Sequence, residues 1–284
     1  MNSIVITQIL NVNYEITTLI VIAIGLAVIL GLLNVLNMAH GEFIMIGAYC
    51  GYMCQSLGWP YLMSIPIALC VCTILGWVVE RLLIRPLYNR PFDTLLATWG
   101  LSLLLREVVD ALFGKGFKSL NVPVSSTIDV WGLFYPTYRV VLICIAICGI
   151  VTIFLWYSKS NAGMRIKAMV SNPDLAQAVG IDTGVLARNT FITGTCFGGL
   201  AGVMVAPLVS VHPYMGLDYI LKSFFVPIVG GFGSLLGLVS GSAIIGGVES
   251  ITSAIINRTY GYSFVLIIAI LFLWLRPNGI FSRT

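Results

Sequence analysis

The sequence predicts an all-α, polytopic integral membrane protein with about nine transmembrane or re-entrant helices. Hydrophobic residues make up 58% of the 284 residues and charged residues only 9%, whereas soluble domains typically carry about 25% charged residues. The mean hydropathy is +1.00. Because backbone groups in hydrocarbon must be hydrogen-bonded within their own segment, each long uncharged run is predicted to be a helix.

Nine apolar segments follow one another along the chain. They leave room for one transmembrane domain over residues 1–284 and for no sizeable aqueous domain. The second, seventh and ninth are short for a span, so re-entrant or tilted segments are expected, and the count carries an error of about one. The segments are Ile16–Leu36, Glu42–Leu57, Tyr61–Leu83, Thr94–Phe113, Thr137–Tyr157, Arg188–Ser210, Tyr219–Gly233, Leu235–Ile256 and Tyr262–Leu275.

Basic residues are concentrated in two loops and at the C-terminal end, which predicts the orientation of the chain. Short loops rich in Lys and Arg stay on the cytoplasmic side. The N-terminus and the loop of residues 114–136 are then outside, and the C-terminus is cytoplasmic. The basic residues assigned to the cytoplasmic side are Arg81, Arg85, Arg90, Lys159, Arg165, Lys167, Arg188, Arg276 and Arg283.

The cytoplasmic loop of about residues 158–187 contains one short predicted helix with signals at both ends. Asn172 suits the N-cap, Pro173 suits the first helical position, and Asp174 favours the positive end of the helix dipole. Gly180 ends the helix. A lone helix of this length would be marginal in water, so we expect it to dock on a partner.

The docking face of this loop helix is predicted from its spacing. Leu175, Ala178 and Val179 fall at i, i+3 and i+4, so they form one narrow apolar face toward the cytoplasm. The alternative is an ordinary amphipathic helix that rests on the lipid headgroups, which the preceding basic residues would favour.

Two interruptions break the pattern of plain apolar helices, near residues 31–41 and 230–237. Paired interruptions of this kind indicate discontinuous helices that line a transport path, and they make an internal repeat plausible. The alternative for His40 and Glu42 is that they cap helix ends and tie them to neighbours. The candidate path residues are Asn34, Asn37, His40, Glu42, Gly230, Gly231 and Ser234.

Ionisable residues inside the apolar segments need partners, because charges are costly in hydrocarbon. Arg106 and Asp110 lie at i and i+4, so we expect an ion pair along one helix. Glu249 is isolated in sequence and is expected to face protein or a water-filled cavity. Three residues near the predicted outer surface are expected to be accessible to an external protein: Lys222, His212 and Asp218.

Neither a metal site nor a cofactor is expected. All seven cysteines lie in apolar stretches without a nearby cluster of His or carboxylate residues, so they are interpreted as small hydrophobic residues. The net charge of +4 is distributed by membrane side and gives no reason to expect a nucleic-acid partner.

Several motifs together resemble one known family over nearly the whole length. The chain looks like the permease subunit of the branched-chain amino acid and urea/amide type of ATP-binding cassette importer. Within this family, Arg90–Ser102 looks closer to the urea and short-chain amide branch. The matching segments are Asn37–Tyr49 (NMAHGEFIMIGAY), Asn172–Asp182 (NPDLAQAVGID), Gly230–Gly237 (GGFGSLLG) and Arg276–Phe281 (RPNGIF).

This resemblance implies that the loop helix is a coupling helix seated on a cytoplasmic ATPase subunit. It also implies a bacterial-type plasma (inner) membrane, a second permease subunit that is a non-identical homologue, two ATPases and an extracytoplasmic solute-binding protein. The chain itself contains no Gly-x-x-x-x-Gly-Lys-Ser/Thr motif and is predicted not to be an enzyme. The solute would be a small polar molecule: urea, a short-chain amide or a branched-chain amino acid.

Two rival functions remain at this stage. A stand-alone channel or an ion-coupled secondary carrier for a small neutral solute would fit the composition, but it has no need of a capped cytoplasmic helix. A membrane enzyme would need a cluster of His, Asp and Glu or a nucleophile beside a base, and the sequence offers neither.

Overall fold

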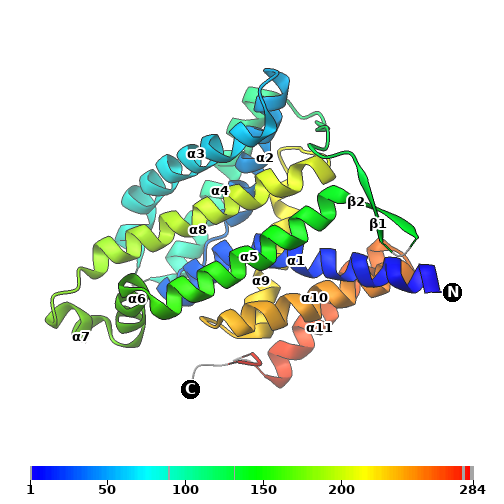
Figure 1. Cartoon of the computed structure of the whole chain (residues 1–284). Helices are drawn as coiled ribbons and strands as arrows, with labels where there is room; N and C mark the ends of the chain where they lie inside the picture. The colour runs from blue at the N-terminus through cyan, green and yellow to red at the C-terminus, as the bar shows by residue number, and fades with distance from the viewer. Residues whose placement is uncertain (1, 89, 131, 277–278, 282–284) are drawn as a thin grey trace.

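Helices dominate the structure. The computed structural model describes residues 2–88, 90–130, 132–276 and 279–281. Within these ranges, each of the nine predicted apolar segments falls on a helix (Figure 1). These helices are α1 (Asn2–Leu33), α2 (His40–Ser56), α3 (Ser64–Val79), α4 (Pro91–Phe113), α5 (Thr137–Lys159), α8 (Thr183–Val205), α9 (Met215–Gly230), α10 (Leu235–Ile255) and α11 (Arg258–Leu275).

Six of the described helices are long and apolar enough to cross a membrane, counting the flanking turns of α3 and α8. They are α1, α3, α5, α8, α10 and α11. Helices α2 and α9 have 17 and 16 residues, which is short for a span. The all-α membrane architecture is therefore confirmed, whereas the number of crossings stays a prediction.

The connecting segments gather at two opposite ends of the bundle. The cytoplasmic loop predicted from sequence forms α6 (Asn161–Ser171) and α7 (Pro173–Ala178) at the left of Figure 1. The start of α1 lies at the right, beside an antiparallel hairpin of β1 (Thr127–Val130) and β2 (Leu133–Pro136). The loop of residues 114–136 thus contains a small sheet that the hydropathy pattern did not predict.

Both predicted interruptions are real breaks between helices. Helix α1 ends at Leu33, and Asn34 follows with a positive φ of 54°. Helix α9 ends at Gly230, and Gly231 has a φ of +106°, a conformation that glycine adopts at no steric cost. The Ser234 hydroxyl then accepts a hydrogen bond from the Gly237 N–H (3.1 Å) and caps α10.

The helices pack in a reciprocal pattern. Helix α1 packs against α8, α9 and α10, while α8 packs against α1, α2 and α3. In Figure 1, α1 runs from right to left and α8 from left to right. Two antiparallel helices that contact equivalent sets of neighbours fit the inverted internal repeat suggested by the interruptions, and the repeat stays a prediction.

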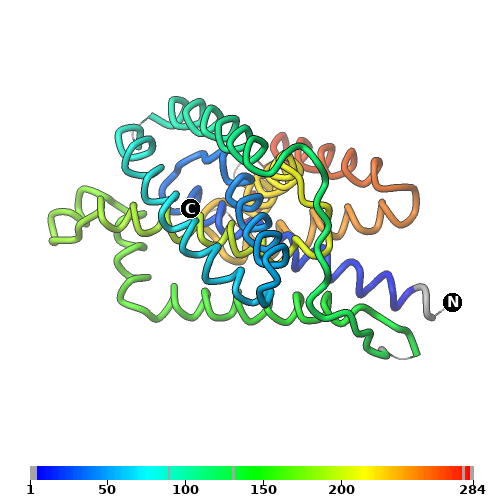
Figure 2. Tube along the Cα trace, turned by 90° about the horizontal axis from the view of Figure 1, so that it is seen from above, coloured from blue at the N-terminus to red at the C-terminus, as the bar shows by residue number. Residues whose placement is uncertain are grey.

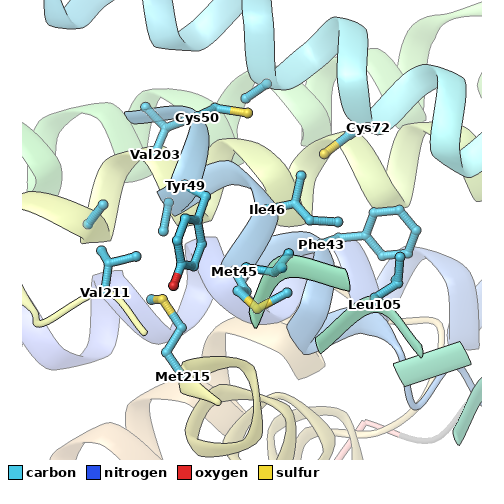
Figure 3. Close-up of a cluster of buried hydrophobic side chains, with 14 of the residues drawn as sticks. Phe43, Met45, Ile46, Tyr49, Cys50, Cys72, Leu105, Val203, Val211 and Met215 are labelled. Atoms are coloured by element: carbon cyan, nitrogen blue, oxygen red, sulfur yellow. The ribbon is translucent and has the colours of Figure 1, made fainter. Parts of the chain in front are cut away.

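Helix α2 lies at the centre of the largest buried cluster (Figure 3). Side chains of α3, α4 and α8 surround it, including Cys72, Leu105 and Val203. Its backbone approaches α8 very closely, because a Cβ atom at Gly47 would overlap the Gly199 carbonyl, and one at Gly202 would overlap the Ile44 carbonyl. Small residues therefore bring α2 and α8 into backbone contact, as is common between membrane helices.

Candidate functional site: a short loop helix and a buried polar network

Helix α7 has the two ends that the sequence predicts. The Asn172 side-chain oxygen accepts a hydrogen bond from the Leu175 N–H (3.0 Å), and Pro173 opens the helix with Asp174 in the first turn. The helix ends at Ala178, and Gly180 follows with a φ of +86°. The local geometry of this segment is therefore encoded within its own residues.

One side of α7 is an exposed apolar face. Leu175 and Val179 are 62% and 69% exposed, and Ala178 is exposed beside them. Ala176 points inward and is only 2% exposed. The face predicted from spacing thus exists and is uncovered in the isolated chain.

Helix α7 is joined tightly to the start of α8. The Ile181 N–H donates to the Ala176 carbonyl (3.0 Å), and the Gln177 amide donates to the Thr183 hydroxyl (2.7 Å). The Asp182 carboxylate then caps α8 by accepting from the Val185 N–H (2.9 Å). A displacement of α7 would accordingly reach α8 through hydrogen-bonded backbone.

At the first interruption, three of the four predicted path residues are buried. Asn37 and His40 are 0% exposed and Glu42 is 1% exposed, while Asn34 is exposed. The His40 Nε2 atom lies 3.1 Å from the Ile22 carbonyl of α1, so this nitrogen is the donor. The Asn37 side-chain oxygen accepts from the Ala39 N–H (3.1 Å). Both residues therefore hold the start of α2 in place.

Glu42 belongs to a buried network that links α2 to α4. The Arg106 Nε atom lies 3.2 Å from Glu42 Oε1, and the Ser102 hydroxyl donates to the same oxygen (2.8 Å). The predicted pairing of Arg106 with Asp110 is wrong, since Asp110 lies 3.7 Å from Lys115 instead. Spacing along one helix could not reveal a partner on another helix.

The segment Arg90–Ser102 supports the first interruption. The Thr98 hydroxyl accepts from the Met38 N–H (3.0 Å) and lies 3.2 Å from the Leu36 carbonyl. Thr98 and Ser102 lie at i and i+4, so they share one face of α4. The first interruption and the segment Arg90–Ser102, which are separate in the sequence, thus form one polar unit.

The family is shown by comparison with known proteins. A family profile described as "Branched-chain amino acid transport system / permease component" matches residues 8–275. This chain belongs to that family. It is a membrane-embedded transport permease component and not an enzyme. No solved structure matches it.

Three relatives of this permease illustrate the similarity. LivH of Escherichia coli (strain K12), a high-affinity branched-chain amino acid transport system permease protein, is 26% identical over 94% of this chain and 92% of LivH. BraD of Pseudomonas aeruginosa, with the same description, is 25% identical over 94% of this chain and 92% of BraD. A probable branched-chain amino acid transport permease protein LivH of Methanocaldococcus jannaschii is 28% identical over 92% of this chain and 88% of that protein.

At the second interruption the permease brings distant segments together. The Ile280 N–H donates to the Val229 carbonyl (3.1 Å) and the Phe281 N–H to the Gly230 carbonyl (2.9 Å), so the C-terminal segment binds the end of α9. A Cβ atom on Gly31 would lie 2.7 Å from the Gly233 Cα. The two interruptions therefore meet at this point.

A second buried ion pair in the permease joins α9 to α10. The Lys222 ammonium lies 2.5 Å from Glu249 Oε1 and 4.5 Å from the centre of the Tyr262 ring on α11. Lys222 is only 8% exposed, so the prediction that it is accessible to an external protein is wrong. Sequence reasoning left Glu249 without a partner because Lys222 lies on a different helix.

The other two residues predicted to be accessible are less buried than Lys222. Asp218 is exposed, and His212 is half-buried and stacked on Phe117, with ring centres 4.9 Å apart. Burial lowers the pKa of His212 below its usual value, while the nearby Asp218 carboxylate opposes this shift. The net shift favours the neutral form of the imidazole.

A cavity of about 890 Å³ lies between α1, α5, α8 and α10. Of the predicted path residues, Gly231 and Ser234 contribute to its lining. No group of three or more His, Cys, Asp or Glu residues arranged to hold a metal ion occurs in the described part of the chain.

Proposed function

We propose that this permease imports a small zwitterionic or neutral polar solute and that ATPase subunits drive it through α7. The observation that carries the proposal is the exposed apolar face of α7, formed by Leu175, Ala178 and Val179 on a helix capped at both ends. An isolated helix of six residues would not persist in water with such a face uncovered. A protein partner explains why the face is there.

The proposed solutes are branched-chain amino acids, with urea and short-chain amides as the second candidates. Relatives that align over nearly the whole chain carry names that specify branched-chain amino acid transport. The segment Arg90–Ser102, which resembles the urea and amide branch, supports the second candidate. One uptake assay with both kinds of solute separates them.

The proposed assembly contains a second permease subunit, two cytoplasmic ATPases and an extracytoplasmic binding protein. Family membership supports ATPase and binding-protein partners. In the proposed orientation, α6, α7 and the C-terminal end face the cytoplasm, because the basic loops lie there. The hairpin of β1 and β2 would then face outward, toward the binding protein.

The proposed mechanism converts closure of the ATPases into movement of helices. A displacement of α7 would pass into α8, against which α1, α2 and α3 pack. The breaks before α2 and after α9 would let the two half-helices reorient and expose the solute to the other side. In this proposal the path runs past the interruptions, where Asn37, His40 and Glu42 line or support it.

The test is uptake into liposomes by the full complex, with leucine, urea and acetamide as labelled solutes. Replacing Leu175 with Arg (Leu175→Arg) should abolish ATP-dependent uptake and weaken copurification of the ATPase, because a charge replaces the centre of the apolar face. In the same assay, normal transport by a folded His40→Ala variant would restrict His40 to a structural role.

The matched control is Leu57→Arg. Leu57 is 57% exposed, close to the 62% of Leu175, but it follows α2 at the opposite end of the molecule from α7. We expect this variant to copurify with the ATPase as the wild type does. Uptake without nucleotide by the permease alone, or normal coupling by Leu175→Arg, would refute the proposal in favour of a channel or carrier.

A further inference from the structure

The cavity between α1, α5, α8 and α10 is lined mainly by hydrocarbon. Each of these helices contributes apolar side chains, including Val28, Ile153, Phe197 and Leu238. Polar groups are few, among them Asn189 and Thr193. Such a lining offers little to a zwitterion, which would have to give up its hydration without gaining charged partners.

The wall formed by α5 is an exposed apolar surface. Helix α5 is strongly apolar, and seven of its large apolar side chains are exposed, among them Ile147, Phe154 and Trp156. In Figure 2, α5 runs along the edge of the bundle, away from its centre. In a bilayer, a cavity beside such a helix would be adjacent to the acyl chains of the surrounding lipid.

One cation lies at the α6 end of the cavity, and two more are close to that end in sequence. Tyr157, Ala162 and Ile166 line that end, and the Lys167 ammonium lies 4.9 Å from the centre of the Tyr157 ring. Lys159 and Arg165 lie within two residues of these lining positions. In the part of the chain that the structure describes, none of these three cations forms an ion pair with a carboxylate: Lys159, Arg165 and Lys167.

A polar atom at the same end also has no partner. The Tyr157 hydroxyl is buried and makes no hydrogen bond to the described residues. A buried hydroxyl without a partner is costly, so native structures usually supply one. A phosphate or ester oxygen beside Lys167 would accept this hydrogen bond and balance the positive charge.

We propose that this cavity binds an anionic phospholipid. Its acyl chain occupies the space between α5 and the rest of the bundle, and its phosphate lies against Lys167 and the Tyr157 hydroxyl. Basic pockets between transmembrane helices on the cytoplasmic side bind anionic headgroups in this way. Helix α5 packs mainly on α1. The lipid would fill the space between α5 and the helices α8 and α10, and would thereby hold α5 in place.

The test is native mass spectrometry of the full chain with phosphatidylglycerol or phosphatidylcholine. We expect the wild type to retain phosphatidylglycerol preferentially. Gly149 lines the cavity, and a Cβ atom there meets no atom within 4 Å, so Gly149→Trp fills the space without a backbone clash. This variant should lose the bound lipid. Gly100→Trp, at an equally open glycine on α4, is the matched control and should keep it.

The headgroup is tested by charge removal. Lys167→Gln should reduce the preference for phosphatidylglycerol over phosphatidylcholine about fivefold, since one basic residue near an anionic surface contributes roughly that factor. Lys115→Gln removes an exposed cation distant from the cavity and should leave the preference unchanged. Equal lipid retention by Gly149→Trp and Gly100→Trp, an unchanged preference in Lys167→Gln, or displacement of the lipid by leucine or urea would overturn the proposal.

Discussion

The two buried ion pairs differ in the number of groups that contact the carboxylate. Glu42 receives both the Arg106 guanidinium and the Ser102 hydroxyl, and Arg106 also contacts Ser102 (3.2 Å). Glu249 has Lys222 as its single ion-pair partner within the described structure. The first pair is a network whose members support one another, whereas the second depends on one contact.

This difference has an energetic consequence. A buried carboxylate that loses its cation is strongly destabilising, unless other donors remain to satisfy it. Because both pairs fasten a short helix, α2 or α9, to a longer neighbour, their loss can be compared within one molecule. The comparison separates the contribution of the charge from that of the surrounding hydrogen bonds.

The largest effect is expected for Lys222→Met. It leaves Glu249 buried without its cation, and breaking a buried pair in this way costs about 3–5 kcal/mol. Thermal unfolding in detergent should show a clear fall in the melting temperature. The double variant Lys222→Met with Glu249→Leu is the control and should recover most of the loss. A single variant as stable as the wild type would show that the pair contributes nothing.

A smaller loss is expected for Arg106→Leu. The Ser102 hydroxyl still donates to Glu42, so we expect a cost of about 2–3 kcal/mol, below that of Lys222→Met. The same unfolding measurement ranks the two variants. If Arg106→Leu proves the more destabilising, the hydrogen bond from Ser102 does not compensate for the missing charge, and the distinction between network and single contact fails.

The smallest effect is expected for Ser102→Ala. It removes the hydroxyl's hydrogen bonds to Glu42 and Arg106 but leaves the ion pair between them in place. We therefore expect a cost of about 1.5 kcal/mol, the lower end of the range for hydrogen bonds to charged groups. Ser263→Ala on α11 is the control, because that exposed hydroxyl only bonds its own helix, at the Thr259 carbonyl (3.2 Å). Indistinguishable melting temperatures for the two variants would argue that Ser102 adds nothing to the network.

Local features of this chain could be predicted from sequence, and contacts between distant helices could not. The ends and the exposed face of α7 depend on residues within ten positions of one another, so Asn172 and Gly180 were sufficient to define them. The breaks at Asn34 and Gly231 were likewise visible, because Gly and polar residues interrupt apolar runs. These features follow from backbone preferences that act over one or two turns.

The partners of Arg106 and Lys222 depend on tertiary packing instead. Helical spacing suggested Asp110 for Arg106, yet the structure places Glu42 there, 64 positions earlier in the chain. A hydropathy pattern places a residue near a membrane surface but does not say whether a neighbouring helix covers it, as happens to Lys222. The hairpin of β1 and β2 was missed because a strand of four residues carries little pattern.

The glycine contacts between α2 and α8 affect how much of a displacement of α7 would reach the inside of the bundle. Ordinary helix pairs are separated by side chains that can change rotamer and absorb a small shift. Where Gly47 meets Gly199 and Gly202 meets Ile44, the two backbones are in direct contact. No side chain lies between them that could absorb a shift by changing rotamer. We therefore expect α8 and α2 to move together as a rigid unit. A displacement of α7 by about an ångström would then move the buried carboxylate of Glu42 by a similar amount.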